Sequence, residues 1–141
     1  MILLADSNVF IKLWRGTNEE RANIKSIMSK NEVLVCGVVR AELFQGAQSE
    51  KTQRDVASTL SMYGTKNLGD NDWDELGHQL RRYKACGFTV PFTDAVIASI
   101  AIKYDIPVWA NDKHFEMMKR VIPGLAVYRT EELILDSDSS E

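Results

Sequence analysis

The strand-like segments of this chain are short, apolar throughout and separated by helical segments. Residues 1–5 (MILLA) contain no polar side chain, which is typical of a central strand covered on both faces. Comparable runs follow at residues 33–36, 107–110 and 125–129. Because strands alternate with helices along the whole chain, the pattern predicts an α/β fold with a central parallel sheet of four to five strands flanked by helices.

Two capping boxes mark expected helix starts. In a capping box, the first residue of a helix turn and the residue three positions later each accept a hydrogen bond from the other's backbone N–H. This spacing occurs at Thr17 with Glu20 and at Asp72 with Glu75. Apolar positions at helical spacing follow the second box, and we expect them in the core: Trp73, Leu76, Leu80 and Tyr83. The expected helices cover residues 18–30, 38–45, 55–63, 72–87, 95–102 and 113–120.

Composition excludes several classes of protein. A chain of 141 residues with 45% hydrophobic and 26% charged residues is an ordinary globular protein, not a disordered, collagen-like or disulfide-scaffold chain. No apolar run approaches the ~20 residues of a membrane span, and residues 1–10 lack the basic start of a signal peptide, so we expect a cytoplasmic protein without membrane contact. Cys36 and Cys86 have no metal-binding spacing and are expected to be buried thiols.

The net charge of −3 conceals an uneven distribution. Residues 131–141 carry five acidic side chains and no Lys or Arg, so we expect a domain over residues 1–130 followed by a solvated acidic tail. Without that tail, 17 basic residues face 15 acidic ones, and the net charge of the domain is +2.

Two aspartates follow predicted strands. Asp6 comes directly after MILLA, and Asp112 is the second residue after PVWA. Ligands of open parallel sheets bind beyond the carboxyl ends of strands, which makes both residues candidates for a functional site. Taken singly, each also fits a plain helix N-cap.

Two further acidic residues interrupt apolar segments. Glu42 lies within VVRAELF, where burial of an unpaired carboxylate would cost several kcal/mol, so it must face solvent, a cation or a partner. Asp94 begins the most apolar helix of the chain, a position that the helix macrodipole alone favours by about 0.3–1 kcal/mol. A doubly wound sheet would bring these two acids and the two strand-end aspartates to one edge. Four adjacent carboxylates need a cation, and an oxygen-only set suits Mg²⁺ or Mn²⁺.

Four short motifs resemble the acidic motifs of the PIN domain, and most closely those of the VapC-type ribonuclease toxins of toxin–antitoxin modules. They are DSN at 6–8, AELxxG at 41–46, FTDAVIA at 92–98 and NDKHF at 111–115. WxxxGxxLR at 73–81 also resembles the segment that precedes the third acid in those toxins. Each motif is short, but their order and spacing extend the resemblance over residues 2–129.

The resemblance implies a metal-dependent endoribonuclease that leaves 5′-phosphate and 3′-hydroxyl ends, acts as a toxin, forms a homodimer and binds a cognate antitoxin. The implied ligands of one or two Mg²⁺ or Mn²⁺ ions are Asp6, Glu42, Asp94 and Asp112. Side chains expected to support them are Ser7, Asn8, Thr93 and Asn111, although Asn8 equally fits a helix cap. We expect His114 to pack or support the site rather than catalyse, and His78 to lie on the surface.

One position departs from the family pattern. These toxins often carry Thr or Ser two residues before the fourth acid, where this chain has Ala110. The missing hydroxyl leaves open a second interpretation, a degenerate PIN-like domain that binds RNA or a protein without cleavage. A third, a different α/β phosphotransfer protein, is disfavoured because strand one is followed by DSN rather than DxD, and the chain has no P-loop.

The charge balance is compatible with an RNA substrate. Without the four candidate ligands, the domain has 17 basic and 11 acidic residues, a net charge of +6. Candidate phosphate contacts are Arg15, Arg40 and Lys113, with Arg81, Arg82, Lys84 and Lys119 as further basic residues, although each also fits a solvated helix face. Three aromatic residues near the first two acids are candidates for an antitoxin groove or for the core: Phe10, Trp14 and Phe44.

Overall fold

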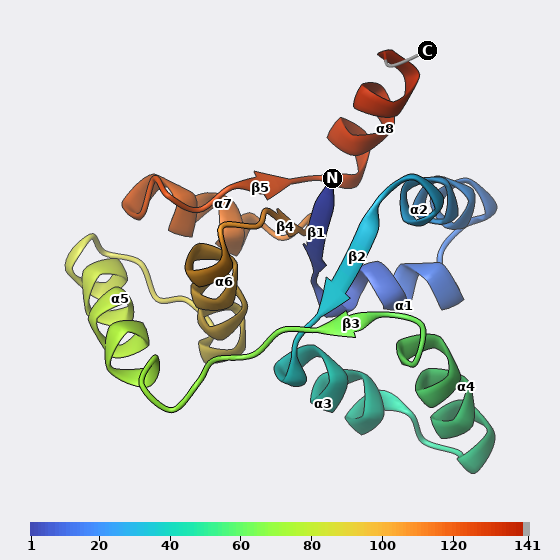
Figure 1. Ribbon diagram of the computed structural model, residues 1–141, viewed down its shortest axis with the longest axis horizontal. Coiled ribbons are helices and arrows are strands. Elements are labelled where there is room, and N and C mark those ends of the chain that lie inside the picture. Colours follow the sequence, from blue (N-terminus) through green and yellow to red (C-terminus); the bar gives the residue numbers. More distant parts are fainter. Residues whose placement is uncertain (140–141) are drawn as a thin grey trace.

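A computed structural model describes residues 1–139 and confirms the predicted α/β class. Its centre is a parallel sheet with the strand order β3-β2-β1-β4-β5 (Figure 1). The strands are β1 (Ile2–Ala5), β2 (Glu32–Val35), β3 (Gly64–Thr65), β4 (Val108–Trp109) and β5 (Val127–Tyr128).

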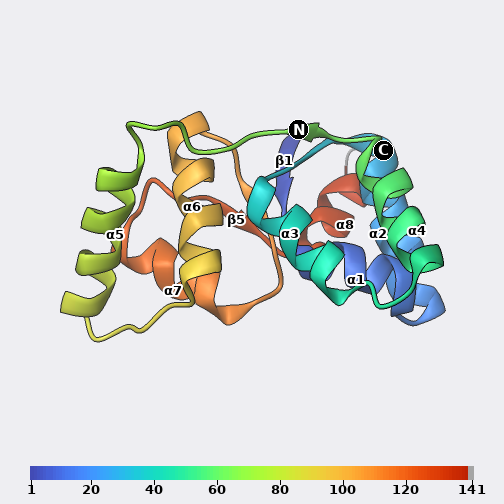
Figure 2. The same cartoon turned by 90° about the horizontal axis from the view of Figure 1, so that it is seen from below.

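Helices connect and flank the strands. They are α1 (Ser7–Arg15), α2 (Asn18–Lys30), α3 (Gly37–Gly46), α4 (Glu50–Leu60), α5 (Trp73–Ala85), α6 (Phe92–Tyr104), α7 (Lys113–Val121) and α8 (Thr130–Ser139). Helices α4 and α5 lie at opposite ends of the molecule in both views (Figures 1 and 2). Within the described residues, no helix has the length and apolar character needed to cross a membrane.

Strand β1 is central, as its apolar sequence predicts. Leu3 and Leu4 have no exposed surface, and Leu4 pairs with Leu34 of β2 on one side and Val108 of β4 on the other. The chain runs outward from β1 to β2 and β3, then returns to add β4 and β5 on the other side. This reversal of strand order beside β1 is where ligands bind in open α/β sheets.

Helix α6 confirms the expected buried helix. Every residue from 95 to 101 is buried, so the helix packs on all sides rather than along one stripe. It begins at Phe92, earlier than expected, and its left-handed C-cap Asp105 (φ 52°) turns the chain toward β4. The first turn of α6 therefore lies at the sheet edge where β1 and β4 end.

Three predictions made around α5 are wrong. Trp73 is 48% exposed, whereas Leu76 and Tyr83 are buried and Leu80 is partly buried, because the core contacts of α5 begin one turn later. Asp72 makes no capping bond to its own helix; its carboxylate accepts hydrogen bonds from the Gly69 N–H and from Lys103. Of the two cysteines, Cys36 is buried as expected, but Cys86 at the end of α5 is exposed.

Other segments differ in extent from their prediction. Helix α4 begins at Glu50 rather than at residue 55, because Ser49 caps it by accepting from the Thr52 N–H. Strand β3 has no apolar signature and was not expected. Within the expected acidic tail, residues up to Ser139 continue helix α8, which lies beside α2 and buries Leu133; residues 140–141 lie outside the described part of the chain.

Candidate metal centre

Asp6 occupies the junction between β1 and α1. Its carboxylate accepts a 2.8 Å hydrogen bond from the Ser7 N–H and so caps α1. A helix cap was one of the two roles that the sequence suggested for Asp6, the other being a functional site. The Asp6 N–H donates to Trp109 O of β4 at 3.0 Å, which fixes the residue at the reversal of strand order. The side chain is only 4% exposed. A cap alone does not require this depth, because capping carboxylates are ordinarily solvated.

Glu42 reaches the same place from helix α3. It is half-buried, and its Oε1 atom lies 3.4 Å from the Ser7 hydroxyl, which also lies 3.4 Å from Asp6 Oδ1. Ser7 is itself buried, so its hydroxyl connects carboxylates from two helices. The apolar neighbours Val39 and Leu43 are buried on α3, which leaves Glu42 facing the end of the sheet.

Asp94 and Asp112 complete the set from the other side. Asp94 is in the first turn of α6, and Asp112 caps α7 by accepting a 2.8 Å hydrogen bond from the His114 N–H. Both aspartates lie at helix starts, Asp94 as the third residue of α6 and Asp112 directly before α7. The four acids predicted from sequence therefore converge, although 106 positions separate the first from the last.

All four acids line one open pocket of about 450 Å³. Its other walls are formed by Ser7, Asn8, Ile11, Gln45, Gly46, Pro91, Thr93 and His114. No Lys or Arg lines this pocket among the described residues, and His114 is the basic side chain in its wall.

The pKa values of Asp6, Glu42 and Asp94 are raised above their ordinary values, mainly by burial. Burial raises the pKa of Asp6 to about 7, assisted by the neighbouring charge of Asp94 and, more weakly, of Glu42 and Asp112. Burial likewise raises the pKa of Glu42, and burial together with Asp112 raises that of Asp94, against the opposing effect of His114. The surroundings of these three carboxyl groups thus make ionisation less favourable than in water, and a bound cation would offset this cost.

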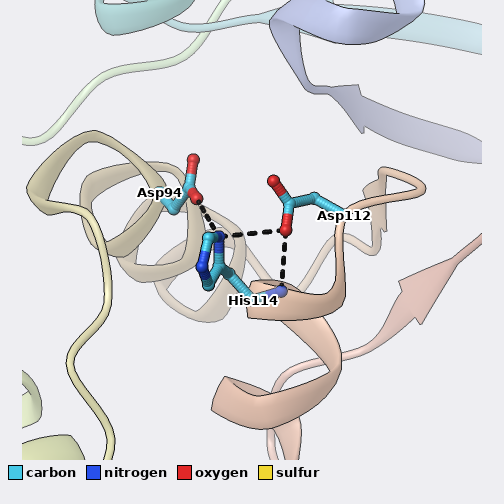
Figure 3. Close-up of side chains that lie close together, drawn as sticks. All are labelled: Asp94, Asp112 and His114. Atoms are coloured by element: carbon cyan, nitrogen blue, oxygen red, sulfur yellow. Dashed lines mark hydrogen bonds and ion pairs between the residues drawn. The ribbon is translucent and has the colours of Figure 1, made fainter.

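His114, which the sequence suggests packs or supports the site, lies against two of the four acids. Its Nδ1 atom lies 3.0 Å from Asp112 Oδ1 and 3.3 Å from Asp94 Oδ2 (Figure 3). One donor atom from each of these three residues lies within 4.8 Å of the others, a spacing that could hold a metal ion. In the sequence, the only sign was the position of His114 two residues after Asp112, on the first turn of α7.

The residues predicted to support the acids are placed differently from one another. Ser7 contacts two of the acids, and Asn8 and Thr93 line the pocket. Asn111 instead pairs with Thr130, accepting from its N–H at 2.9 Å and donating to its hydroxyl at 3.2 Å. Ala110 is 1% exposed, so a hydroxyl at this position would need space within the core. His78 is exposed, as predicted.

An apolar groove of about 330 Å³ adjoins the acidic pocket and shares Ile11, Glu42 and Gly46 with it. Trp14 and the candidate RNA contact Arg15 line this groove. Of the other two aromatic candidates, Phe10 is buried in the core and Phe44 is 36% exposed without lining the groove. The remaining candidate RNA contacts are half-buried Arg40 on α3 and exposed Lys113, the residue after Asp112.

Comparison with known proteins identifies the fold. Similar solved structures include VapBC2 from Rickettsia felis bound to a DNA fragment from its promoter, with a TM-score of 0.75, 21% identity, and coverage of 92% of this chain and 98% of that one. VapBC-1 from nontypeable Haemophilus influenzae gives a TM-score of 0.75, 17% identity, and 93% and 99% coverage. A toxin–antitoxin complex from Klebsiella pneumoniae has a TM-score of 0.69 and 18% identity, with coverage of 91% of this chain and 97% of that one.

At these identities, the structural likeness establishes the fold. No curated protein sequence matches the chain at a significant level. The PIN domain family, by contrast, matches residues 3–121, a span that contains all four converging acids and His114. The chain belongs to the PIN domain family.

Proposed function

We propose that this protein is a metal-dependent endoribonuclease, the VapC-like toxin of a type II toxin–antitoxin pair. The observation that carries the proposal is the convergence of four carboxylates from four separate segments in one open pocket at the reversal of strand order. A purely structural cluster of acids would carry its own positive charges, and no Lys or Arg lines this pocket among the described residues. Membership of the PIN family and the likeness to toxin–antitoxin complexes support the same function.

The donor set fits a divalent cation. Asp6, Glu42, Asp94 and Asp112 would hold Mg²⁺ or Mn²⁺, whose preferred protein ligands are carboxylate oxygens. Burial without a countercharge raises the pKa of Asp6 to about 7, which is the expected condition of a buried ligand in the metal-free protein. When bound, such an ion lowers the pKa of a water ligand and neutralises charge on the phosphate being hydrolysed.

The chain's own residues would orient the site and the substrate. The Ser7 hydroxyl, between Asp6 and Glu42, would hold the two carboxylates at a fixed separation. Asn8 and Thr93 line the pocket and present polar groups to a phosphate or a water molecule. Lys113, exposed next to Asp112, and Arg15, at the adjoining groove, would contact RNA phosphates on either side of the pocket.

The apolar groove beside the pocket supports an antitoxin partner. Ile11, Trp14, Leu43 and Val56 give it an apolar surface, and Arg15, Arg21 and Asp55 give it a charged rim. An amphipathic segment of an antitoxin would place its apolar face in this groove. Because Glu42 lines both the groove and the acidic pocket, the same segment would extend to the acids. We also propose that the protein is a homodimer, as the resemblance to VapC-type toxins implies; light scattering that gives a monomer at all concentrations would contradict this.

The test is cleavage of RNA by purified protein with Mg²⁺ or Mn²⁺. Asp6→Asn and Asp94→Asn should each abolish cleavage while the far-UV circular dichroism spectrum stays unchanged, because each variant loses a charged ligand and no packing volume. Asp70→Asn, an exposed residue outside the pocket, is the matched control and should cleave like the wild type. Full cleavage by either pocket variant would rule out the catalytic assignment. Failure of the wild type to bind any divalent ion would favour the degenerate, non-cleaving interpretation.

A further inference from the structure

His114 faces the acidic pocket rather than the core or the solvent. It lies on the first turn of α7, and its Nδ1 atom is within ion-pair distance of carboxylate oxygens from Asp94 of α6 and from Asp112, the N-cap of α7 (Figure 3). The Nδ1 atom is inaccessible to solvent, although the side chain as a whole is 28% exposed. The nitrogen is therefore the end of the ring that the fold buries.

Hydrogen bonding does not account for this placement. Although both oxygens are near, the Nδ1 atom makes a hydrogen bond of good geometry to neither. Buried ring nitrogens are ordinarily hydrogen-bonded, because an unpaired one loses its hydration without compensation. The Nδ1 atom thus lies between two carboxylates at ion-pair distance, a place where a shared cation could replace a proton.

The spacing of the three donor atoms fits a shared metal ion. In an octahedral site with bonds of about 2.1 Å, two ligand atoms in adjacent positions lie about 3.0 Å apart. The Nδ1 atom is 3.0 Å from Asp112 Oδ1 and 3.3 Å from Asp94 Oδ2. The same three residues are the group whose donor atoms lie within 4.8 Å of one another.

We infer that His114 coordinates the divalent ion through Nδ1, together with Asp94 and Asp112, so that the centre has a mixed nitrogen and oxygen donor set. The inference rests on the proposed metal-dependent function. Imidazole nitrogen binds first-row transition metals better than it binds Mg²⁺, for which oxygen ligands suffice. The chain therefore favours Mn²⁺ over Mg²⁺ more strongly than a centre made of the four carboxylates alone would.

The test uses Mn²⁺ as the probe and measures binding rather than cleavage. Calorimetry gives the Mn²⁺ and Mg²⁺ affinities of the full chain, and pulsed electron paramagnetic resonance of bound Mn²⁺ detects a directly coordinated nitrogen. The signal is assigned by labelling histidine with ¹⁵N. The variants are His114→Gln and His114→Ala, and His78→Gln is the matched control on the exposed face of α5.

We expect a ¹⁵N-sensitive nitrogen coupling in the wild type and in His78→Gln, and its loss in both His114 variants. Loss of the nitrogen ligand should weaken Mn²⁺ binding roughly tenfold or more and Mg²⁺ binding less, which narrows the preference between the two ions. Mn²⁺ binding without nitrogen coupling, or tighter Mn²⁺ binding in His114→Ala, would overturn the inference and identify His114 as a competing cation while leaving the metal site intact. Absence of Mn²⁺ binding in the wild type would instead contradict the proposed function itself.

Discussion

Two hydrogen bonds join the side chain of Asn111 to Thr130 at the start of helix α8. The Thr130 hydroxyl also accepts a 3.0 Å hydrogen bond from Trp109 Nε1, so one oxygen receives donors from the last residue of β4 and from the β4–α7 connection. Asp112 is the next residue of that connection. Helix α8 lies outside the family match, yet it fixes the loop that carries one of the candidate ligands.

Removal of the Thr130 hydroxyl should therefore destabilise the protein. In Thr130→Val, the Nε1 group of Trp109, which has no exposed surface, loses its acceptor, and the free energy of unfolding should fall by about 1–3 kcal/mol. Thr130→Ser keeps the oxygen and is the control, with an expected change below about 1 kcal/mol. Urea unfolding of both variants measures the difference, and equal losses would show that the methyl group rather than the hydroxyl matters.

The raised pKa of Asp6 predicts a pH-dependent stability in the metal-free protein. Between its unfolded value near 3.8 and its folded value of about 7, the folded state binds the extra proton, so stability falls as pH rises through this range and levels off above it. Asp6→Asn removes this effect while keeping an acceptor for the Ser7 N–H. Urea unfolding in a chelator should find Asp6→Asn more stable than the wild type at pH 8, by up to about 4 kcal/mol, and equal to it near pH 4.

Asp70→Asn serves as the control for that comparison, because Asp70 is exposed and outside the pocket. It should follow the wild-type pH profile. A wild-type profile that is flat between pH 4 and 8 would mean that Asp6 ionises normally, and the electrostatic account of the pocket would then fail.

A divalent ion should stabilise the folded chain through the same carboxylates. Ligand bound only to the folded state adds about 2.7 kcal/mol at a concentration one hundred times its dissociation constant. Mn²⁺ should therefore raise the melting temperature of the wild type and of Asp70→Asn, and should do so far less for Asp94→Asn. Equal shifts in all three proteins would locate the binding of Mn²⁺ elsewhere.

Ala110→Thr tests the hydroxyl that this chain lacks. Because Ala110 is 1% exposed, two added heavy atoms should cost about 1–3 kcal/mol of stability through overpacking. Ala110→Val has nearly the same shape without the hydroxyl and should lose a similar amount. Tighter Mn²⁺ binding and faster cleavage are expected in the Thr variant alone; if both variants behave alike toward Mn²⁺, the hydroxyl has no role at the site.

Structural features were predictable from the sequence where they depended on residues close together in the chain. The apolar run at residues 1–5 identified the central strand, and the Thr17–Glu20 capping box is present as predicted. Acids at strand ends converge for a topological reason, since parallel strands place their carboxyl ends at one edge, and this makes the pocket of Asp6 and Asp112 predictable.

The predictions failed where a partner distant in sequence decided the outcome. Asp72 does not cap α5 because Lys103 of α6 and the Gly69 N–H bind its carboxylate. The Asn111 side chain turns to Thr130 for the same kind of reason, and α8 forms in a segment whose charges alone suggest a tail because Leu133 finds a buried site beside α2.

The role inferred for His114 shows this division most directly. Its sequence position, two residues after Asp112, indicated packing or support of the site and gave no sign of coordination, because α7 can present that ring in several directions. Only the packing of α7 against α6 brings the ring nitrogen within 3.3 Å of Asp94, a residue 20 positions earlier. Topology makes the meeting of Asp6 and Asp112 predictable, since both follow parallel strands. The direction of each side chain follows from how the helices pack, which no short motif encodes.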